Sequence, residues 1–152
     1  MPTQITDDLL IKPVRAITLR APWSDLTALR IKGIENRSWN TNYRGLVLVH
    51  SGLAVDRRAF SDAHVAVALA ADYDPEANAG RVVALAELID VHKDAECCRP
   101  WGDAGAYHFV WGDIVPLPRP VRTRGYQQLW VPKADLLLGI LAETARAQRT
   151  VV

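Results

Sequence analysis

Cysteine is scarce in this 152-residue chain, which has only the adjacent Cys97 and Cys98. Neighbouring cysteines rarely pair, and no second cysteine pair is present to build a zinc site. We therefore expect two free thiols, a reducing cytoplasmic location and no metal. The sequence also lacks a glycine-rich phosphate loop and a serine in a nucleophile-elbow context. We expect no cofactor and no serine hydrolase triad.

An excess of one charge and long apolar runs are also missing. The 18 Lys and Arg residues against 17 Asp and Glu residues give a formal net charge of +1. No global field then draws the protein to nucleic acid or membrane, so any nucleic-acid binding needs a local patch. No apolar run approaches the length that spans a bilayer, and we expect no membrane partner. The sequence leaves the oligomeric state open.

The content of hydrophobic residues, 49%, argues against disorder, and the length suits one domain with a proper core. We expect a flexible N-terminal arm over residues 1–12. It contains Asp7 and Asp8 and no basic region, unlike a signal peptide. A single domain over residues 13–152 is expected to follow and to end in a C-terminal helix.

Hydrophobic periodicity and turn residues predict a mixture of strands and helices. Strands are expected at 14–20, 33–39, 46–50, 81–91, 107–111 and 127–131, and helices at 22–31, 56–71 and 133–149. Prolines at 116, 118 and 120 predict an extended connector that is not a central strand. Short turns make 46–50 the expected antiparallel partner of 33–39. This order is not a regular βαβ alternation and fits an α+β fold, a small mixed or closed β-structure with helices at its sides.

The stretch 30–39 carries an amine, a carboxylate, a guanidinium and an indole within ten residues. If a strand starts at Gly33, then Glu35, Arg37 and Trp39 share one face, and Lys32 enters from the preceding turn. This composition suits a small polar pocket with an aromatic wall. From spacing alone, Lys32 and Glu35 are most simply a surface salt bridge. Placed together in a cleft, they would instead give a buried lysine that can act as a base or nucleophile.

Five tryptophans are many for this length, and most are expected to pack in the core. Trp39, beside polar residues, is the best candidate for a platform on which a base stacks, followed by Trp101 in an irregular loop. Several arginines form either a basic rim for phosphate or an ordinary solvated surface. The predicted ligand-binding residues are Trp23, Arg37, Trp39, Tyr43, Arg44 and Arg124.

Residues 16–23, 31–39, 43–45 and 48–50 resemble the ASCH domain family of the PUA-like superfamily. The family signature is a strand, a short helix, a G-x-K-x-x-E-x-R-type segment and a strand, and Arg30 stands where the glycine is usual. The resemblance covers most of 14–131. It implies a small PUA-like β-barrel with flanking helices and a cleft next to Lys32 and Glu35. PUA-like domains mostly bind RNA, and relatives read modified bases.

The resemblance leaves three hypotheses. The first is a nucleic-acid or nucleoside binding module whose partner is RNA or a modified nucleoside. The second is an enzyme, because some ASCH proteins are amidohydrolases acting on acetylated cytidine and others are reported as ribonucleases. Lys32 and Glu35 would then be catalytic without a metal, and the amidohydrolase type would add an acidic residue, for which Asp90, Asp94 and Glu96 are candidates by chemistry only. The third is a protein-interaction module.

Overall fold

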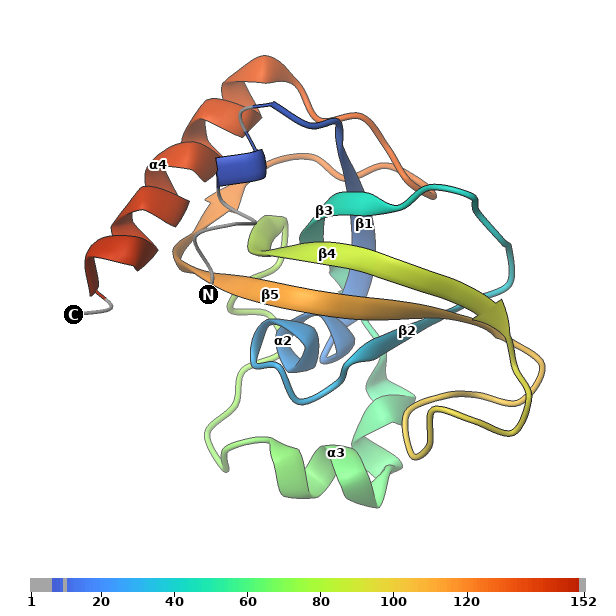
Figure 1. The fold of residues 1–152 in the computed structure, drawn as a ribbon. Coiled ribbons are helices and arrows are strands. Elements are labelled where there is room, and N and C mark those ends of the chain that lie inside the picture. Colours follow the sequence, from blue (N-terminus) through green and yellow to red (C-terminus); the bar gives the residue numbers. More distant parts are fainter. Residues whose placement is uncertain (1–6, 10, 151–152) are drawn as a thin grey trace.

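A mixed sheet of five strands, curled towards a barrel, organises residues 7–9 and 11–150, the part of the chain that the computed structural model describes (Figure 1). The strands are β1 Val14–Ala21, β2 Ile34–Arg37, β3 Gly45–Val55, β4 Arg81–Lys93 and β5 Tyr107–Arg122. Their order is β1-β3-β4-β5-β2, so β1 and β2 are the two edges of the sheet. The β1–β3 pair is parallel and the other pairs are antiparallel.

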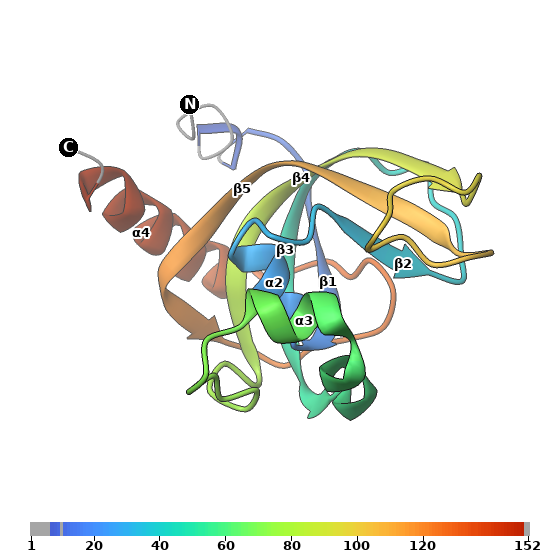
Figure 2. The ribbon, with the colours of Figure 1, turned by 90° about the horizontal axis from the view of Figure 1, so that it is seen from below.

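Helices flank this sheet on two sides. They are α2 Trp23–Ala28, the short 3-10 helix η1 Arg57–Ser61, α3 Ala63–Ala68 and α4 Ala134–Thr150. In Figures 1 and 2, α4 lies beside β5, whereas α2 and α3 lie on another side of the molecule, away from α4. None of the helices in the described residues is long and apolar enough to cross a membrane. The predicted α+β, barrel-like fold with flanking helices is confirmed.

The core has two parts because successive strand residues face opposite sides of the sheet. On β3, Leu46 and Leu48 join the cluster that packs against Ile140 of α4. Val47 and Val49 join the other cluster, which includes Phe109 of β5. The prediction that 46–50 is a strand buried on both faces is confirmed by this burial. Of the arm predicted over 1–12, residues 1–6 and 10 lie outside the described residues; Leu9 is buried in the first cluster.

One predicted strand pairing is wrong. The stretch after Gly33 forms β2, which pairs with β5 (Ile34 with Val110, Arg37 with Tyr107) and not with β3. A strand has two edges, and both edges of β3 are taken by the longer strands β1 and β4. The tight hairpin expected from the turn at 40–45 therefore does not form.

The prediction for the proline segment is confirmed in part: it is extended and not a central strand, but it belongs to β5, which runs on through Pro116, Pro118 and Pro120, and is not a connector. β2 pairs only with Tyr107–Val110, so the proline half of β5 borders β4 alone. That half is an edge strand, where proline is tolerated. The strand predicted at 127–131 is reduced to a single bridge between Ala16 and Trp130.

Two of the three predicted helices are shorter than expected, whereas the helix expected over 133–149 is confirmed as α4, Ala134–Thr150. The helix expected over 56–71 is split into η1 and α3 by Asp62, whose backbone is extended (φ −79°, ψ 125°) and whose side chain caps α3 by accepting from the His64 N–H. The helix expected over 22–31 ends at Ala28. Arg30 then takes a left-handed conformation, with φ of 62°. This is the position at which the ASCH signature has glycine, the residue that adopts positive φ most easily.

Candidate functional site

The candidate site lies where the two edge strands of the sheet approach each other. Arg37 of β2 donates from Nη2 to the backbone oxygen of Thr18 on β1, at 2.7 Å. β1 and β2 do not pair in the sheet, so this side chain bridges its open seam. Glu35 lies two residues earlier on the same face of β2, as the alternation predicts.

Lys32 is buried at the base of the site, with 2% of its surface exposed. Its Nζ donates to the backbone oxygen of Ile34 at 2.8 Å and to Glu35 Oε1 at 3.0 Å. The same Nζ lies over the ring of Trp23, 5.2 Å from its centroid. The simple expectation of a surface salt bridge is therefore wrong, because α2 and the turn after it direct the amine inward. The ammonium has two oxygens and a π face as partners.

Glu35 lies between two cations. Its Oε1 accepts from Lys32, and its Oε2 lies 3.5 Å from Arg37 Nε. That Nε is buried and, among the described residues, has no hydrogen-bond partner. The separation is at the outer limit of hydrogen bonding, so the contact is an ion pair with a donor still unsatisfied. The rest of the guanidinium is more accessible, because 24% of the Arg37 side chain is exposed and the residue lines a cavity.

A cavity of about 620 Å³ opens in front of these groups. β1 contributes Thr18, Leu19 and Arg20 to its wall, β2 contributes Glu35 and Arg37, and the indoles of Trp23 and Trp39 complete the polar and aromatic sides. The remaining lining residues are Gly52, Leu53, Ala54, Tyr126, Gln127 and Gln128. Glu35 is the one carboxylate among the described residues that line the cavity.

Both indoles are held in place from behind. Trp23 donates from Nε1 to Asp56 Oδ2 at 2.9 Å. Trp39 packs edge-on against Phe109, with ring centroids 5.0 Å apart. Their ring orientations are thus fixed before any ligand enters, which lowers the entropy cost of stacking.

The cavity brings together Trp23, Glu35, Arg37 and Trp39, with Lys32 behind Glu35. Tyr43 and Arg44 lie elsewhere. Tyr43 donates its hydroxyl to the backbone oxygen of Leu46 at 2.6 Å, and Arg44 is exposed and donates to the oxygens of its own turn. Their predicted roles in ligand binding therefore have no support from this geometry.

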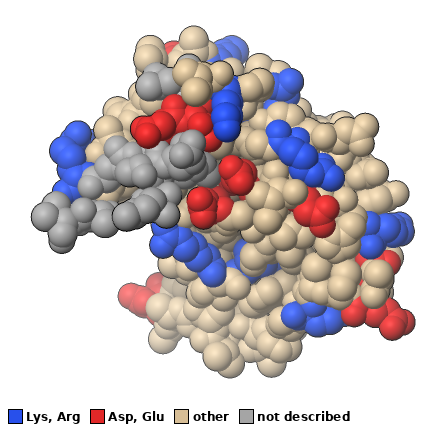
Figure 3. Space-filling model, in the orientation of Figure 1, with Lys and Arg blue, Asp and Glu red and all other residues tan. Residues whose placement is uncertain are grey.

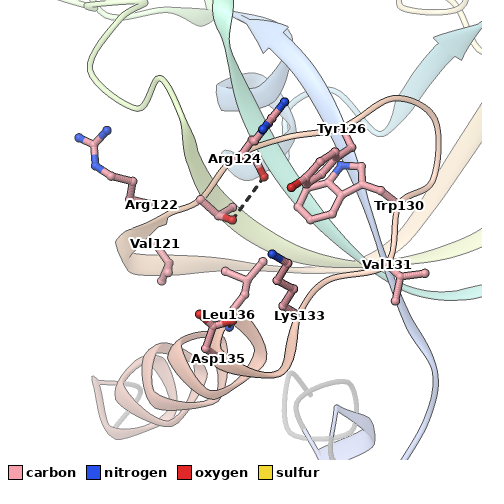
Figure 4. Close-up of a pocket in the computed structure, with 10 residues that line it drawn as sticks. Val121, Arg122, Arg124, Tyr126, Trp130, Val131, Lys133, Asp135 and Leu136 are labelled. Carbon is pink, nitrogen blue, oxygen red and sulfur yellow. Dashed lines mark hydrogen bonds between the residues drawn. The ribbon is translucent and has the colours of Figure 1, made fainter.

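Arg124 lies in a neighbouring cavity of about 550 Å³, which Figure 4 shows between the end of β5, the loop after it and the start of α4. Tyr126, Trp130 and Lys133 share that cavity. Arg124 stacks on Tyr126, 5.4 Å from its centroid. Tyr126 also lines the 620 Å³ cavity, so the two hollows adjoin each other along the loop.

His50 is a structural residue inside β3, where it belongs to a chain of hydrogen bonds. Trp130 Nε1 donates to Thr18 Oγ1, Thr18 Oγ1 lies 3.1 Å from His50 Nδ1, and His50 Nε2 lies 2.9 Å from the Thr123 oxygen. Since Thr18 Oγ1 accepts from Trp130, its hydroxyl donates to His50 Nδ1, and the imidazole carries its proton on Nε2, which donates to the Thr123 oxygen. Burial lowers the pKa of His50, in agreement with a neutral ring.

The acidic residues proposed by chemistry do not line the cavity. Asp90 contacts His92, Asp94 contacts Arg99, and Glu96 is exposed in the loop between β4 and β5.

Two residues near the site were not predicted from the sequence. Asp56 accepts a hydrogen bond from Trp23, which lines the cavity, and no motif marks it in the sequence. Asn36 was missed as well: it donates to the Trp101 oxygen at 2.9 Å and ties the loop to β2.

That loop and the strand ends beside it hold a second group of side chains that the sequence did not reveal. His92, Cys97, Cys98 and His108 place one ligand atom each within 4.8 Å of one another. The expectation of no metal rested on the lack of a second cysteine pair. Two histidines, His92 and His108, take the place of a second cysteine pair in this group of possible metal ligands. Their spacing from the cysteines in the sequence matches no familiar metal-binding motif.

Comparison with solved structures identifies the fold. Two variants of ZmASCH from Zymomonas mobilis match this chain with TM-scores of 0.53 and 0.52, each at 12% sequence identity. Each match covers 86% of this chain, and 98% and 96% of the respective ZmASCH chains. The chain has an ASCH fold. No family model and no curated protein sequence matches it, so the ASCH likeness rests on the fold together with the residues quoted above.

Proposed function

We propose that the 620 Å³ cavity binds a nucleoside or an unpaired base of single-stranded RNA. The base stacks on one of the two indoles, Glu35 accepts from an exocyclic amino group, and Arg37 donates to a base carbonyl or a phosphate oxygen. The resemblance to ASCH proteins, as members of a superfamily that mostly binds RNA, supports the same class of ligand.

The observation that carries the proposal is the Arg37 guanidinium at the wall of a cavity with aromatic sides. Its Nε is buried against Glu35, but 24% of the side chain is exposed, so its outer donors can reach a ligand. A hydrogen bond from a charged donor contributes about 1.5–3 kcal/mol. Trp23 and Trp39 provide π faces, and stacking on such a face contributes about 1–3 kcal/mol per base.

The position of Lys32 favours binding over catalysis. It does not line the cavity, and its Nζ is occupied by the Ile34 oxygen, Glu35 and the Trp23 ring. A lysine nucleophile needs a lone pair directed at the substrate, which this arrangement does not offer. Its role in the proposal is to orient Glu35. The concave site also argues against the protein-interaction hypothesis, which expects Lys32 and Glu35 on a convex face.

The surface charge argues for a short or single-stranded ligand. Figure 3 shows basic and acidic side chains interspersed over the visible face, with no continuous basic band across its described residues. High affinity for a long duplex needs many phosphate contacts, and the formal net charge is +1.

Calorimetric titration with nucleosides, their 5′-monophosphates and a short single-stranded RNA tests this proposal. We expect Arg37→Gln to weaken binding roughly ten- to a hundredfold, because it removes a charged hydrogen bond. Arg44→Gln is the matched control and leaves binding unchanged, since Arg44 is exposed and outside the cavity.

Equal affinity of the wild type and Arg37→Gln, or no binding of any of these ligands, would contradict the proposal. Incubation with N4-acetylcytidine and with single-stranded RNA, without added metal, tests the enzyme hypothesis in parallel. Turnover that disappears in Lys32→Ala would replace binding by catalysis as the function of the cavity.

A further inference from the structure

Two histidines and two cysteines converge where β4 and β5 separate. His92 comes from the end of β4, His108 from the start of β5, and Cys97 and Cys98 from the loop between them. His92 Nε2 lies 3.3 Å from Cys97 Sγ and 3.5 Å from Cys98 Sγ. Cys97 Sγ lies 3.7 Å from His108 Nδ1. β4 and β5 pair His92 directly with His108, so the sheet register itself sets these two rings side by side.

Three of the six separations among the four ligand atoms match those of a tetrahedral metal site, and all six are within 4.8 Å. With Zn–S bonds of about 2.3 Å and Zn–N bonds of about 2.0–2.1 Å, neighbouring sulfur and nitrogen ligands of one zinc lie about 3.5 Å apart. The distances from nitrogen to sulfur in the cluster, 3.3, 3.5 and 3.7 Å, bracket that value.

The second nitrogen of each histidine is already engaged. His92 Nδ1 lies 2.6 Å from Asp90 Oδ2, and His108 Nε2 lies 3.0 Å from the Asp103 oxygen. Donation to these acceptors leaves the lone pairs of His92 Nε2 and His108 Nδ1 directed at the cluster. Metal-binding histidines nearly always have such a partner, which fixes the tautomer and the ring orientation.

The loop is shaped to deliver the thiols. Cys98 has a φ of 62°, a backbone conformation that residues other than glycine rarely adopt. Arg99 holds the turn by donating from Nη1 to the oxygens of Cys97 and Gly102, at 2.6 and 2.7 Å. A Cβ on Gly102 would lie 2.8 Å from His108 Cε1 and 2.9 Å from Cys98 Cβ, so the loop closes tightly over the cluster.

We propose that His92, Cys97, Cys98 and His108 bind one Zn²⁺ in a structural site. Two thiolates with two imidazoles form a donor set that suits zinc, and four protein ligands leave no open position for a substrate. The ion would clamp the loop of 94–106 to the ends of β4 and β5. Through Asn36, which contacts both the Trp101 oxygen and the Asp103 N–H, the clamp also supports β2 beside the cavity. The zinc site does not depend on the proposed function of that cavity.

Metal analysis of the folded, reduced protein tests the site. We expect a single zinc per chain after purification or reconstitution with Zn²⁺. Substitution by Co²⁺ should give the ligand-field bands of a tetrahedral site together with thiolate-to-metal charge transfer. Asp90→Asn, which weakens the support of His92, should lower zinc affinity about 10–100-fold in competition with a chromophoric chelator.

Removal of a ligand should lower the affinity further than Asp90→Asn does. Cys97→Ser and His92→Ala are the variants of choice because both side chains are partly exposed, whereas His108 is fully buried. His64→Ala is the control: His64 is exposed, lies outside the cluster and should leave zinc binding unchanged. Circular dichroism verifies that each variant is folded.

Four results would overturn the proposal. The first is folded, reduced wild-type protein that takes up no zinc. The second is wild-type affinity in Cys97→Ser or His92→Ala. The third is a Co²⁺ spectrum without thiolate charge transfer. A disulfide between Cys97 and Cys98, detected by mass spectrometry in protein kept under reductant, would count against the site in the same way.

Discussion

Replacement of Lys32 by methionine tests whether the ion pair under the cavity is as buried as the structure has it. Methionine keeps most of the aliphatic volume and removes the ammonium. Loss of one partner from a buried pair costs about 3–5 kcal/mol, because the other charge is left without compensation. Glu35 retains Arg37 at 3.5 Å. We therefore expect a loss at the lower end, about 3 kcal/mol in the free energy of unfolding.

Urea unfolding followed by tryptophan fluorescence and circular dichroism measures this loss. The midpoint should fall while the slope m stays unchanged. The double variant Lys32→Met/Glu35→Gln should be less unstable than the two single variants combined, with a coupling energy of about 1–3 kcal/mol. Arg57→Met provides the control, because Arg57 and Glu76 form a pair whose side chains are 69% and 66% exposed.

For Arg57→Met we expect a change of about 0.2–1 kcal/mol or less, as is usual for an exposed pair. The reasoning is refuted if Lys32→Met costs no more than this control, or if the cycle between Lys32 and Glu35 gives no coupling. Either result would mean that water reaches the pair and that Glu35 is not held in place by Lys32.

Two further predictions concern the hydrogen-bonded chain behind the site. Because burial lowers the pKa of His50, its ring should titrate by NMR below the usual value of about 6.5, and stability should be lost as the pH falls below that value; titration at or above about 6.5 would contradict the structure. Gly125→Ala should cost about 1–3 kcal/mol in unfolding experiments, because the new Cβ would lie 2.6 Å from His50 and from Thr18 Oγ1. Gly33→Ala, whose Cβ would meet nothing within 4 Å, is the matched control; equal costs for the two would show that Gly125 is not tightly enclosed.

The sequence predicts the part of the site that is local in the chain. Alternation along 34–37 places Glu35 and Arg37 on one face, and the turn after α2 brings Lys32 beside them. Arg30 is a second local case. It stands where the ASCH signature has glycine, and its backbone adopts the positive φ that glycine adopts most easily.

Contacts between distant segments could not be predicted in this way. The partner of β2 depends on competition for the edges of β3, which no single stretch reveals. The proline half of β5 is tolerated only because β2 is short and leaves an edge. His92 and His108 become neighbours through the register of two long strands. Their spacing from the cysteines matches no familiar motif, so the sequence alone led to the expectation of no metal.

The central claim is that ligands bind through Arg37 and the two indoles. An NMR titration with a nucleoside 5′-monophosphate, monitoring the backbone amide, Arg37 Nε–H and indole N–H signals, tests it most directly. We predict saturable shifts of the Arg37 Nε–H and of Trp23 or Trp39, with Lys133 in the neighbouring cavity unaffected. Shifts confined to Trp130 and the residues around Lys133, or no saturable shifts at all, would contradict the account.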